Sequence, residues 1–209
     1  MTEKEKMLAG LLYDPTDEEL SALRIKGHRL SQEYNLTFET DTQRRKEILD
    51  ELLPNRGRNT FIQGPVQFDY GRFITVGENF YANFNFTVLD TCPVTIGDNV
   101  FFGPNCTIAT ALHDLDPVKR RLRTREDGSV YDLEYGSPVT IGNDCWIASN
   151  VVICAGVNIG NNVVIAAGAV VTHDIPDNCM AGGVPARKIK DIPCDAGNIP
   201  TDFEKREDI

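Results

Sequence analysis

The amino-acid sequence predicts a mainly β protein: a parallel β-helix of six-residue repeats, preceded by a short helical segment and interrupted by one long loop. From Val139 onward a small apolar residue recurs at every sixth position through seven steps, at Val139, Cys145, Val151, Val157, Val163, Ala169, Ile175 and Ala181. A period of six scatters residues over several faces of an α-helix. It fits short strands joined by corners, three to a turn, because each strand can then pair with the turns above and below it.

Residues 1–55 are expected to be helical. Leu20, Leu23, Leu30 and Tyr34 fall on one face of a helix. Three pairs also resemble capping boxes, in which a threonine hydroxyl and a side chain three residues later satisfy free backbone amides; they are Thr2 with Glu5, Thr16 with Glu19, and Thr40 with Gln43. We therefore expect two or three short amphipathic helices before the repeats begin.

The repeats are expected over residues 56–192. An earlier block, with Ile74, Phe80 and Phe86 and then Val94 and Val100, keeps the same period except for a step of eight residues between Phe86 and Val94. Two extra residues predict a bulge or a wider corner there. Gly, Asn and Asp follow the expected strands at 96–99, 141–144 and 159–162. These residue types suit corners because they tolerate positive φ.

The register breaks once, between Thr110 and Val139, which predicts an inserted loop over residues 111–138. Long loops in compact repeats are more often functional than structural. This one opens on Leu112-His113-Asp114 and carries a basic run at 119–125 that is typical of a solvated loop. Residues 193–209 are expected to form an irregular tail.

Composition and charge exclude several classes of partner. The chain has 209 residues, with 21 basic and 31 acidic side chains and a net charge of −10. A negative surface repels phosphate backbones and anionic lipid, so we expect neither nucleic acid nor a membrane as the main partner. The first ten residues have no apolar signal segment and no stretch is long and apolar enough to span a bilayer, which favours the cytoplasm.

The cysteines argue against a metal centre. Six are present, at Cys92, Cys106, Cys145, Cys154, Cys179 and Cys194, with no CxxC pair and no nearby histidine. Zinc sites and disulfide frameworks have characteristic cysteine spacings that are missing here. We expect these thiols to pack as small apolar groups and the protein to need no metal.

Three stretches together resemble the maltose and galactoside O-acetyltransferase family. They are residues 74–100, which contain YANFN at 81–85, residues 111–117 with the loop histidine, and residues 138–190. The resemblance includes the helical start. It implies a left-handed β-helix, a homotrimer, and a cleft between neighbouring subunits in which acetyl-CoA meets a hydroxyl of a sugar or glycoside.

The resemblance assigns the general base to His113. A sugar hydroxyl is a poor nucleophile at neutral pH, so its proton must leave as the oxygen attacks the thioester. A neutral imidazole suits this step. His113 is one of three histidines and the one at the start of the inserted loop. Without the resemblance, a loop histidine bonded to a backbone carbonyl is the more ordinary reading.

Other site residues follow from the same resemblance. On the acceptor side they are Asn83, Asp69 and Asp90, with Asp14 or Asp17 reaching in from the helical start. Asp69 stands where the family often has serine, which leaves the acceptor open. Asn85 is expected to be an ordinary corner residue. Glu134 is a candidate for orienting His113 by accepting a hydrogen bond from its second ring nitrogen.

The donor side is expected along the C-terminal turns. The matching positions are Trp146, Ser149, Ala167, Thr172, His173, Arg187 and Lys190. Backbone amides near Ser149 would meet the thioester oxygen as charge develops on it. Arg187 and Lys190 would offset the negative charge of the CoA phosphates. His173 replaces a lysine that is common among relatives, so one phosphate contact is expected to be weaker.

Three alternatives remain open. One keeps the fold but acetylates an antibiotic or an amino sugar. A metal hydratase on the same kind of helix needs about three converging histidines, whereas His28 lies in the helical segment, far from His113 and His173 in sequence. A non-catalytic trimeric scaffold would keep the repeats and bind no CoA.

Overall fold

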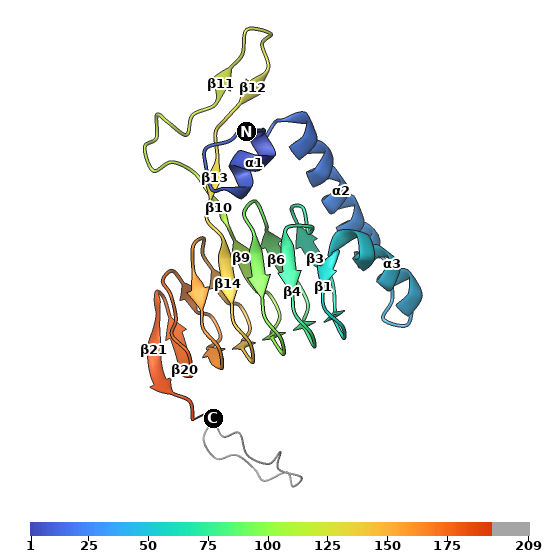
Figure 1. The fold of residues 1–209 in the computed structure, drawn as a ribbon, viewed down its shortest axis with the longest axis vertical. Coiled ribbons are helices and arrows are strands. Elements are labelled where there is room, and N and C mark those ends of the chain that lie inside the picture. Colours follow the sequence, from blue (N-terminus) through green and yellow to red (C-terminus); the bar gives the residue numbers. More distant parts are fainter. Residues whose placement is uncertain (194–209) are drawn as a thin grey trace.

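The computed structural model describes residues 1–193, and the tail expected over 193–209 falls outside them except for Pro193. Three helices, α1 (Glu3–Leu8), α2 (Glu18–Asn35) and α3 (Thr42–Leu52), precede a column of stacked strands (Figure 1). The Thr2–Glu5 capping box is confirmed. The predicted boxes at Thr16 and Thr40 are wrong, because Asp17 and Asp41, one residue later, are the N-caps of α2 and α3. Thr16 instead donates to the Asp14 carboxylate through its amide and its hydroxyl.

The predicted parallel β-helix is confirmed, with three sheets as its faces. The first sheet contains β1 (Asn55–Arg56), β4 (Ile74–Val76), β7 (Val94–Ile96), β14 (Val139–Ile141) and β17 (Asn158–Ile159). The second contains β2 (Phe61–Ile62), β5 (Tyr81–Ala82), β8 (Phe101–Phe102), β15 (Trp146–Ile147), β18 (Val163–Ile165), β20 (Cys179–Gly183) and β21 (Ala186–Asp191). The third contains β3 (Val66–Phe68), β6 (Phe86–Leu89), β9 (Thr107–Ala109), β16 (Val152–Ile153) and β19 (Val170–Val171).

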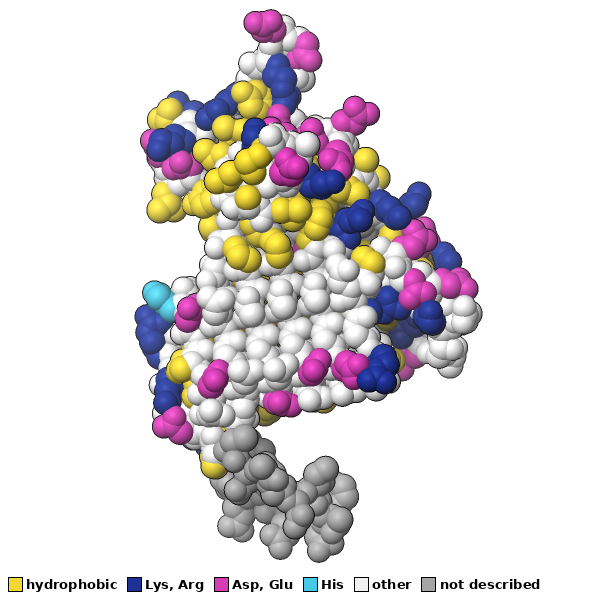
Figure 2. Space-filling view, viewed as in Figure 1, with side chains coloured by type: hydrophobic (Ala, Val, Ile, Leu, Met, Phe, Trp, Pro, Cys, Tyr) yellow, Lys and Arg dark blue, Asp and Glu magenta, His cyan; other side chains and the backbone are white. Residues whose placement is uncertain are grey.

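Alternate residues of each strand point into a continuous apolar core. In β4, β7 and β14 the outer two residues are buried and the central threonine is exposed. Figure 2 shows the result: the face over β4 and β14 is largely free of charged side chains. The six-residue spacing seen in the sequence is therefore the spacing of inward side chains from one face to the next.

The column of stacked turns has three edges, where neighbouring sheets meet, and we name each edge by the residues that it carries. The glycine edge, between the first and second sheets, carries Gly57, Gly77, Gly97, Gly142 and Gly160. The serine edge, between the second and third sheets, carries Ser149. The loop edge, between the third and first sheets, carries the inserted loop, whose ends pair as β10 (Ala111–Leu112) with β13 (Tyr135–Gly136). A hairpin of β11 (Arg123–Thr124) and β12 (Val130–Tyr131) projects from this loop, away from the column (Figure 1).

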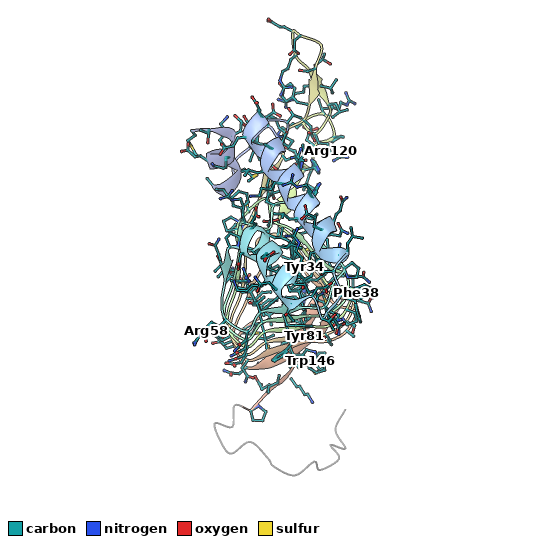
Figure 3. The ribbon with its side chains drawn as sticks, turned by 90° about the vertical axis from the view of Figure 1, so that its right-hand side faces the viewer. Tyr34, Phe38, Arg58, Tyr81, Arg120 and Trp146 are labelled. Atoms are coloured by element: carbon teal, nitrogen blue, oxygen red, sulfur yellow. The ribbon has the colours of Figure 1, made fainter. Side chains whose placement is uncertain are left out.

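The helices close the first turn of the column. Tyr34 of α2 is buried among Leu30, Ile48 and Leu52, and its hydroxyl donates to the Ile62 carbonyl at 2.6 Å. Figure 3 shows Tyr34 between the helices and the strands. The segment before α2 runs on to the loop edge, where Tyr13 pairs with Glu134. Two distant parts of the sequence thus meet at one edge. No helix in the described residues is long and apolar enough to cross a bilayer.

Candidate active site

The loop edge gathers the acidic residues and the histidine that the sequence singled out. Asp69 follows β3, Asp90 follows β6, and His113 follows β10, the short strand after β9, so successive turns place them at the same edge. From Val66 to Ile74 and from Phe86 to Val94 the inward step at this edge is eight residues, and in the next turn the whole loop is inserted there. The predicted wider corner after Phe86 therefore occurs twice, and it makes room for polar side chains.

His113 lies between two carboxylates. Its Nδ1 is 3.9 Å from Oδ2 of Asp132, and its Nε2 is 3.9 Å from Oε1 of Glu134. The imidazole is about half exposed, with 52% of the side-chain surface accessible. Both carboxylates come from the segment between β12 and β13, where the inserted loop returns to the column, and Leu133 separates them in sequence. Side chains two residues apart on an extended segment share a face, so both can reach one ring.

Tyr13 holds Glu134 in three ways. The two residues exchange backbone hydrogen bonds, with the Tyr13 amide donating to the Glu134 carbonyl at 2.9 Å and the Glu134 amide donating back at 3.1 Å. The Tyr13 hydroxyl also donates to Oε2 of Glu134 at 2.8 Å. Burial, and then the neighbouring Glu134 charge, raises the pKa of Tyr13, so the phenol stays a donor. The helical segment thereby fixes a carboxylate that faces His113.

A polar pocket of about 320 Å³ opens beside Glu134. It lies between the N-terminal segment and the loop edge, and its lining consists of Tyr13, Pro15, Thr16, Arg24, Asp69, Tyr70, Thr91 and Glu134. Asp69 is largely buried, which raises its pKa, although His28 Nε2 at 3.5 Å opposes that effect. Carboxylates, hydroxyls and a guanidinium around one cavity suit a ligand rich in hydroxyl groups.

Asp90, Asp14 and Asp17 are engaged elsewhere. Asp90 is fully buried, where its carboxylate accepts the amides of Tyr70 at 2.8 Å and Phe73 at 3.3 Å. Asp14 accepts from Thr16 and from the Arg125 guanidinium of the inserted loop, and these bonds outweigh burial and lower its pKa. Asp17 caps α2 by accepting the Leu20 amide. None of the three lines the pocket.

Asn83 and part of the donor set lie at the serine edge. Asn83, Ser149 and Ala167 each follow a strand of the second sheet, namely β5, β15 and β18. Trp146 is half exposed on the same sheet, in register with Phe101 and Tyr81 (Figure 3). Asn85 has φ of 60° and its amide donates to Asn105, as expected of a corner residue.

The remaining donor residues lie elsewhere. Thr172 and His173 follow β19 at the loop edge, and the Thr172 hydroxyl lies 2.8 Å from Nδ1 of His173. Arg187 and Lys190 are exposed on β21, which folds back antiparallel to β20. Within one chain the third sheet therefore separates Asn83, Ser149 and Ala167 from His113, Thr172 and His173.

Family models match three parts of the chain. Residues 6–57 match the maltose acetyltransferase hexapeptide capping motif, residues 93–114 a hexapeptide repeat of succinyl-transferase, and residues 138–173 the bacterial transferase hexapeptide. The galactoside O-acetyltransferase of Escherichia coli (strain K12) is 43% identical over 188 residues, which are 90% of this chain and 88% of that protein.

The chain belongs to the maltose and galactoside O-acetyltransferase family.

Solved structures of the family agree with this membership. A maltose O-acetyltransferase from Clostridium difficile 630 has a TM-score of 0.85 at 44% identity and covers 92% of this chain and 98% of its own. A galactoside acetyltransferase in complex with coenzyme A has a TM-score of 0.84 at 40% identity, with 92% of both chains covered. As a member of this O-acetyltransferase family, the chain is an acyltransferase that uses acetyl-CoA.

Sequence reasoning missed four residues of the site: Tyr13, Arg24, Thr91 and Asp132. The eight-residue steps could have located Thr91, because they mark the corner where polar residues gather. Tyr13, Arg24 and Asp132 had no such signal, since their positions depend on how the helices and the loop fold against the column.

Proposed function

We propose that this O-acetyltransferase transfers the acetyl group of acetyl-CoA to a hydroxyl of a sugar or glycoside, directly and without an acyl-enzyme. The observation that carries this is the polar pocket of Asp69, Arg24, Tyr13 and Thr91, which opens beside the Glu134 carboxylate at His113. The chain's similarity to a galactoside O-acetyltransferase and to a maltose O-acetyltransferase supports the same acceptor class.

His113 is the general base of this proposal. It takes the proton of the acceptor hydroxyl as the oxygen attacks the thioester carbonyl, and passes that proton to the departing CoA thiolate. Amides near Ser149 stabilise the oxyanion that develops in between. Asp69 and Arg24 bind acceptor hydroxyls, whereas Asp90, with its carboxylate bonded to backbone amides, supports the shape of the corner.

The active unit is a homotrimer in this proposal. Asn83 and Ser149 lie at the serine edge of one chain and His113 at its loop edge, so the set is completed when the serine edge of one subunit faces the loop edge of the next. Exposed apolar side chains near the loop edge support such contacts; they are Leu11, Leu12, Leu115, Val118 and Leu122. A closed ring uses each subunit's two edges once.

Thr172, His173, Arg187 and Lys190 are proposed to bind the CoA phosphates.

A cytoplasmic location also stays a prediction; the free thiols of the five cysteines in residues 1–193 are consistent with a reducing compartment.

The test is release of CoA thiol from acetyl-CoA across a panel of glucosides, galactosides, maltose, amino sugars and chloramphenicol. We expect saturable turnover with a sugar or glycoside. Turnover with chloramphenicol or an amino sugar alone would favour the alternative acceptor class, and no turnover with any hydroxyl acceptor would contradict the proposal.

The His113→Ala variant tests the base. We expect its turnover to fall about 100- to 10,000-fold, or about 2.7 to 5.4 kcal/mol of barrier, because the hydroxyl proton loses its acceptor. Thermal unfolding checks that the variant is folded, and Glu126→Ala, at an exposed position of the same loop, is the control. An unchanged rate in folded His113→Ala protein rejects the assignment.

A further inference from the structure

Glu134 and Asp132 flank His113 from opposite ring nitrogens, and their surroundings differ. Glu134 lines the polar pocket, and one of its oxygens is already occupied by the Tyr13 hydroxyl. Asp132 does not line the pocket, and within residues 1–193 it has no hydrogen-bond partner besides its approach to Nδ1 of His113. The two carboxylates therefore cannot be equivalent in the reaction.

The two nitrogens of the His113 ring therefore have different surroundings. Nε2 faces Glu134, a residue that lines the pocket, and in the proposed function the acceptor hydroxyl approaches the ring from that side. Nδ1 lies on the Asp132 side. A base that takes a proton at Nε2 must carry its own hydrogen on Nδ1, because a neutral imidazole has one donor and one acceptor nitrogen.

We propose that Asp132 is the positioning residue of this enzyme: it accepts the Nδ1 hydrogen of His113, and so holds the ring in the form whose Nε2 is free to take the acceptor proton. This rests on the proposed function of His113. The separation of 3.9 Å is longer than a hydrogen bond, and such contacts commonly shorten when substrates bind. As the imidazole becomes cationic, the Asp132 charge stabilises it.

The local charges permit this role. Among the described residues, the ionisable side chains beside the ring are Asp132 and Glu134, both in the segment between β12 and β13, and Tyr13 of the N-terminal segment is bonded to Glu134. Asp132 is largely buried, with 22% of its side-chain surface accessible, so water screens its charge less than that of a fully exposed group.

The kinetic test compares Asp132→Asn with Glu126→Gln, which removes one negative charge from an exposed position of the same loop. In Asp132→Asn we expect kcat to fall about 10- to 100-fold while KM for acetyl-CoA stays within about twofold. The acid limb of its pH–rate profile should move to lower pH, because the cationic ring has lost a stabilising charge. Asp132→Glu should retain more activity than Asp132→Asn.

The spectroscopic test does not depend on turnover. Nitrogen-15 NMR of the histidine rings, with the His113 signals assigned by their loss in His113→Asn, reports which nitrogen carries hydrogen. We expect hydrogen on Nδ1 in the unmodified protein and a mixed or reversed form in Asp132→Asn.

Two results would overturn the inference: kinetics of Asp132→Asn equal to those of Glu126→Gln, or hydrogen on Nε2 in the unmodified protein. Failure of the unmodified protein to acetylate any acceptor is a different result. It counts against the proposed function, and the spectrum still decides the position of the hydrogen.

Discussion

Asp90 is a buried carboxyl group whose hydrogen bonds hold the backbone of the loop edge. Burial raises its pKa to about 6, against the lowering effect of the Tyr70, Gly71 and Phe73 amides. The folded state therefore binds this proton more tightly than the unfolded state does. The contribution of Asp90 to stability is largest below the unfolded pKa near 4 and is lost as the pH rises to about 6.

Replacing Asp90 by Asn should reveal this dependence. The wild type minus variant difference in unfolding free energy is expected to decrease by about 2 to 3 kcal/mol between pH 4 and pH 7, because only the wild type carries the ionisable group. Urea unfolding of both proteins at several pH values measures it. A difference that stays constant with pH contradicts the assignment of a raised pKa, whatever the absolute cost of the substitution.

Some residue roles follow from sequence alone and others do not. The corner position of Asn85 was predictable because asparagine tolerates its positive φ. Placement of His113 at the start of the loop was predictable from the break in the period. The burial of Asp90 and the engagement of Asp14 with Arg125 were not, because a carboxylate in the sequence does not show which partner will fold against it.

At the scale of elements, one arginine joins the inserted loop to the helical segment. The Arg125 guanidinium bonds to the Asp14 carboxylate and the Thr16 hydroxyl, and it stacks over the Tyr131 ring at 4.2 Å. These contacts connect the hairpin of β11 and β12 to the chain before α2. The loop that carries the histidine is thus fastened on the side facing the pocket.

Arg125→Ala should loosen this attachment. We expect faster hydrogen–deuterium exchange in residues 123–131, by about 5- to 10-fold, because a partly buried ion pair and a cation–π contact together contribute about 1 kcal/mol. Arg123→Ala is the matched control, since Arg123 lies on the same hairpin with an exposed side chain. Equal exchange in the two variants would show that the attachment lies elsewhere.

The glycine edge sets a limit on the spacing of turns. A Cβ at Gly97 would lie 2.4 Å from Oδ1 of Asn143 and 2.8 Å from the Gly142 carbonyl carbon. Gly97→Ala is therefore expected to lower the unfolding free energy by about 2 to 3 kcal/mol, because neither the Gly142 backbone nor the Asn143 side chain, which is hydrogen-bonded to Asp98 and Asn161, can move freely. Denaturant unfolding measures it, with the exposed Thr95→Ala of the same turn as control. A loss below about 0.5 kcal/mol would contradict the close approach.

Elements were predictable where a local rule governs them. The column follows from a period that survives seven steps, and it appeared with the expected corners. The starts of α2 and α3 were misplaced by one residue, because Thr and Asp are both good N-caps and adjacent in each case. The contacts between the inserted loop and the N-terminal segment were not predictable, because they depend on tertiary packing and no repeating pattern in the sequence marks them.

At the scale of the whole molecule, the division of site residues between two edges makes a quantitative prediction. If Asn83 of one subunit serves His113 of its neighbour, then Asn83→Ala and His113→Ala proteins, each nearly inactive, should complement each other. When the two are unfolded together in equal amounts and refolded, about one quarter of the sites combine an intact serine edge with an intact loop edge.

The activity of the mixture is expected to recover to about a quarter of the wild-type value per site. Refolding each variant alone is the control, and analytical ultracentrifugation checks that the mixture forms the same oligomer as the wild type. Recovery no greater than the sum of the two variants would show that each chain supplies both residues of its own site.

The stacking of turns also fixes a length. Each turn adds about 4.8 Å along the column, and β16 and β19 stand between the turn of His113 and the antiparallel end strands that carry Arg187 and Lys190. If Arg187 and Lys190 bind the CoA phosphates and His113 is the base, as proposed, the distance from the phosphates to the acyl carbon is set by the number of turns between them. Under that proposal, inserting one turn of about eighteen residues would suit an acyl donor with a longer chain between phosphate and thioester. Removing one turn would suit a shorter donor, and in both cases the loop edge around His113 stays unchanged.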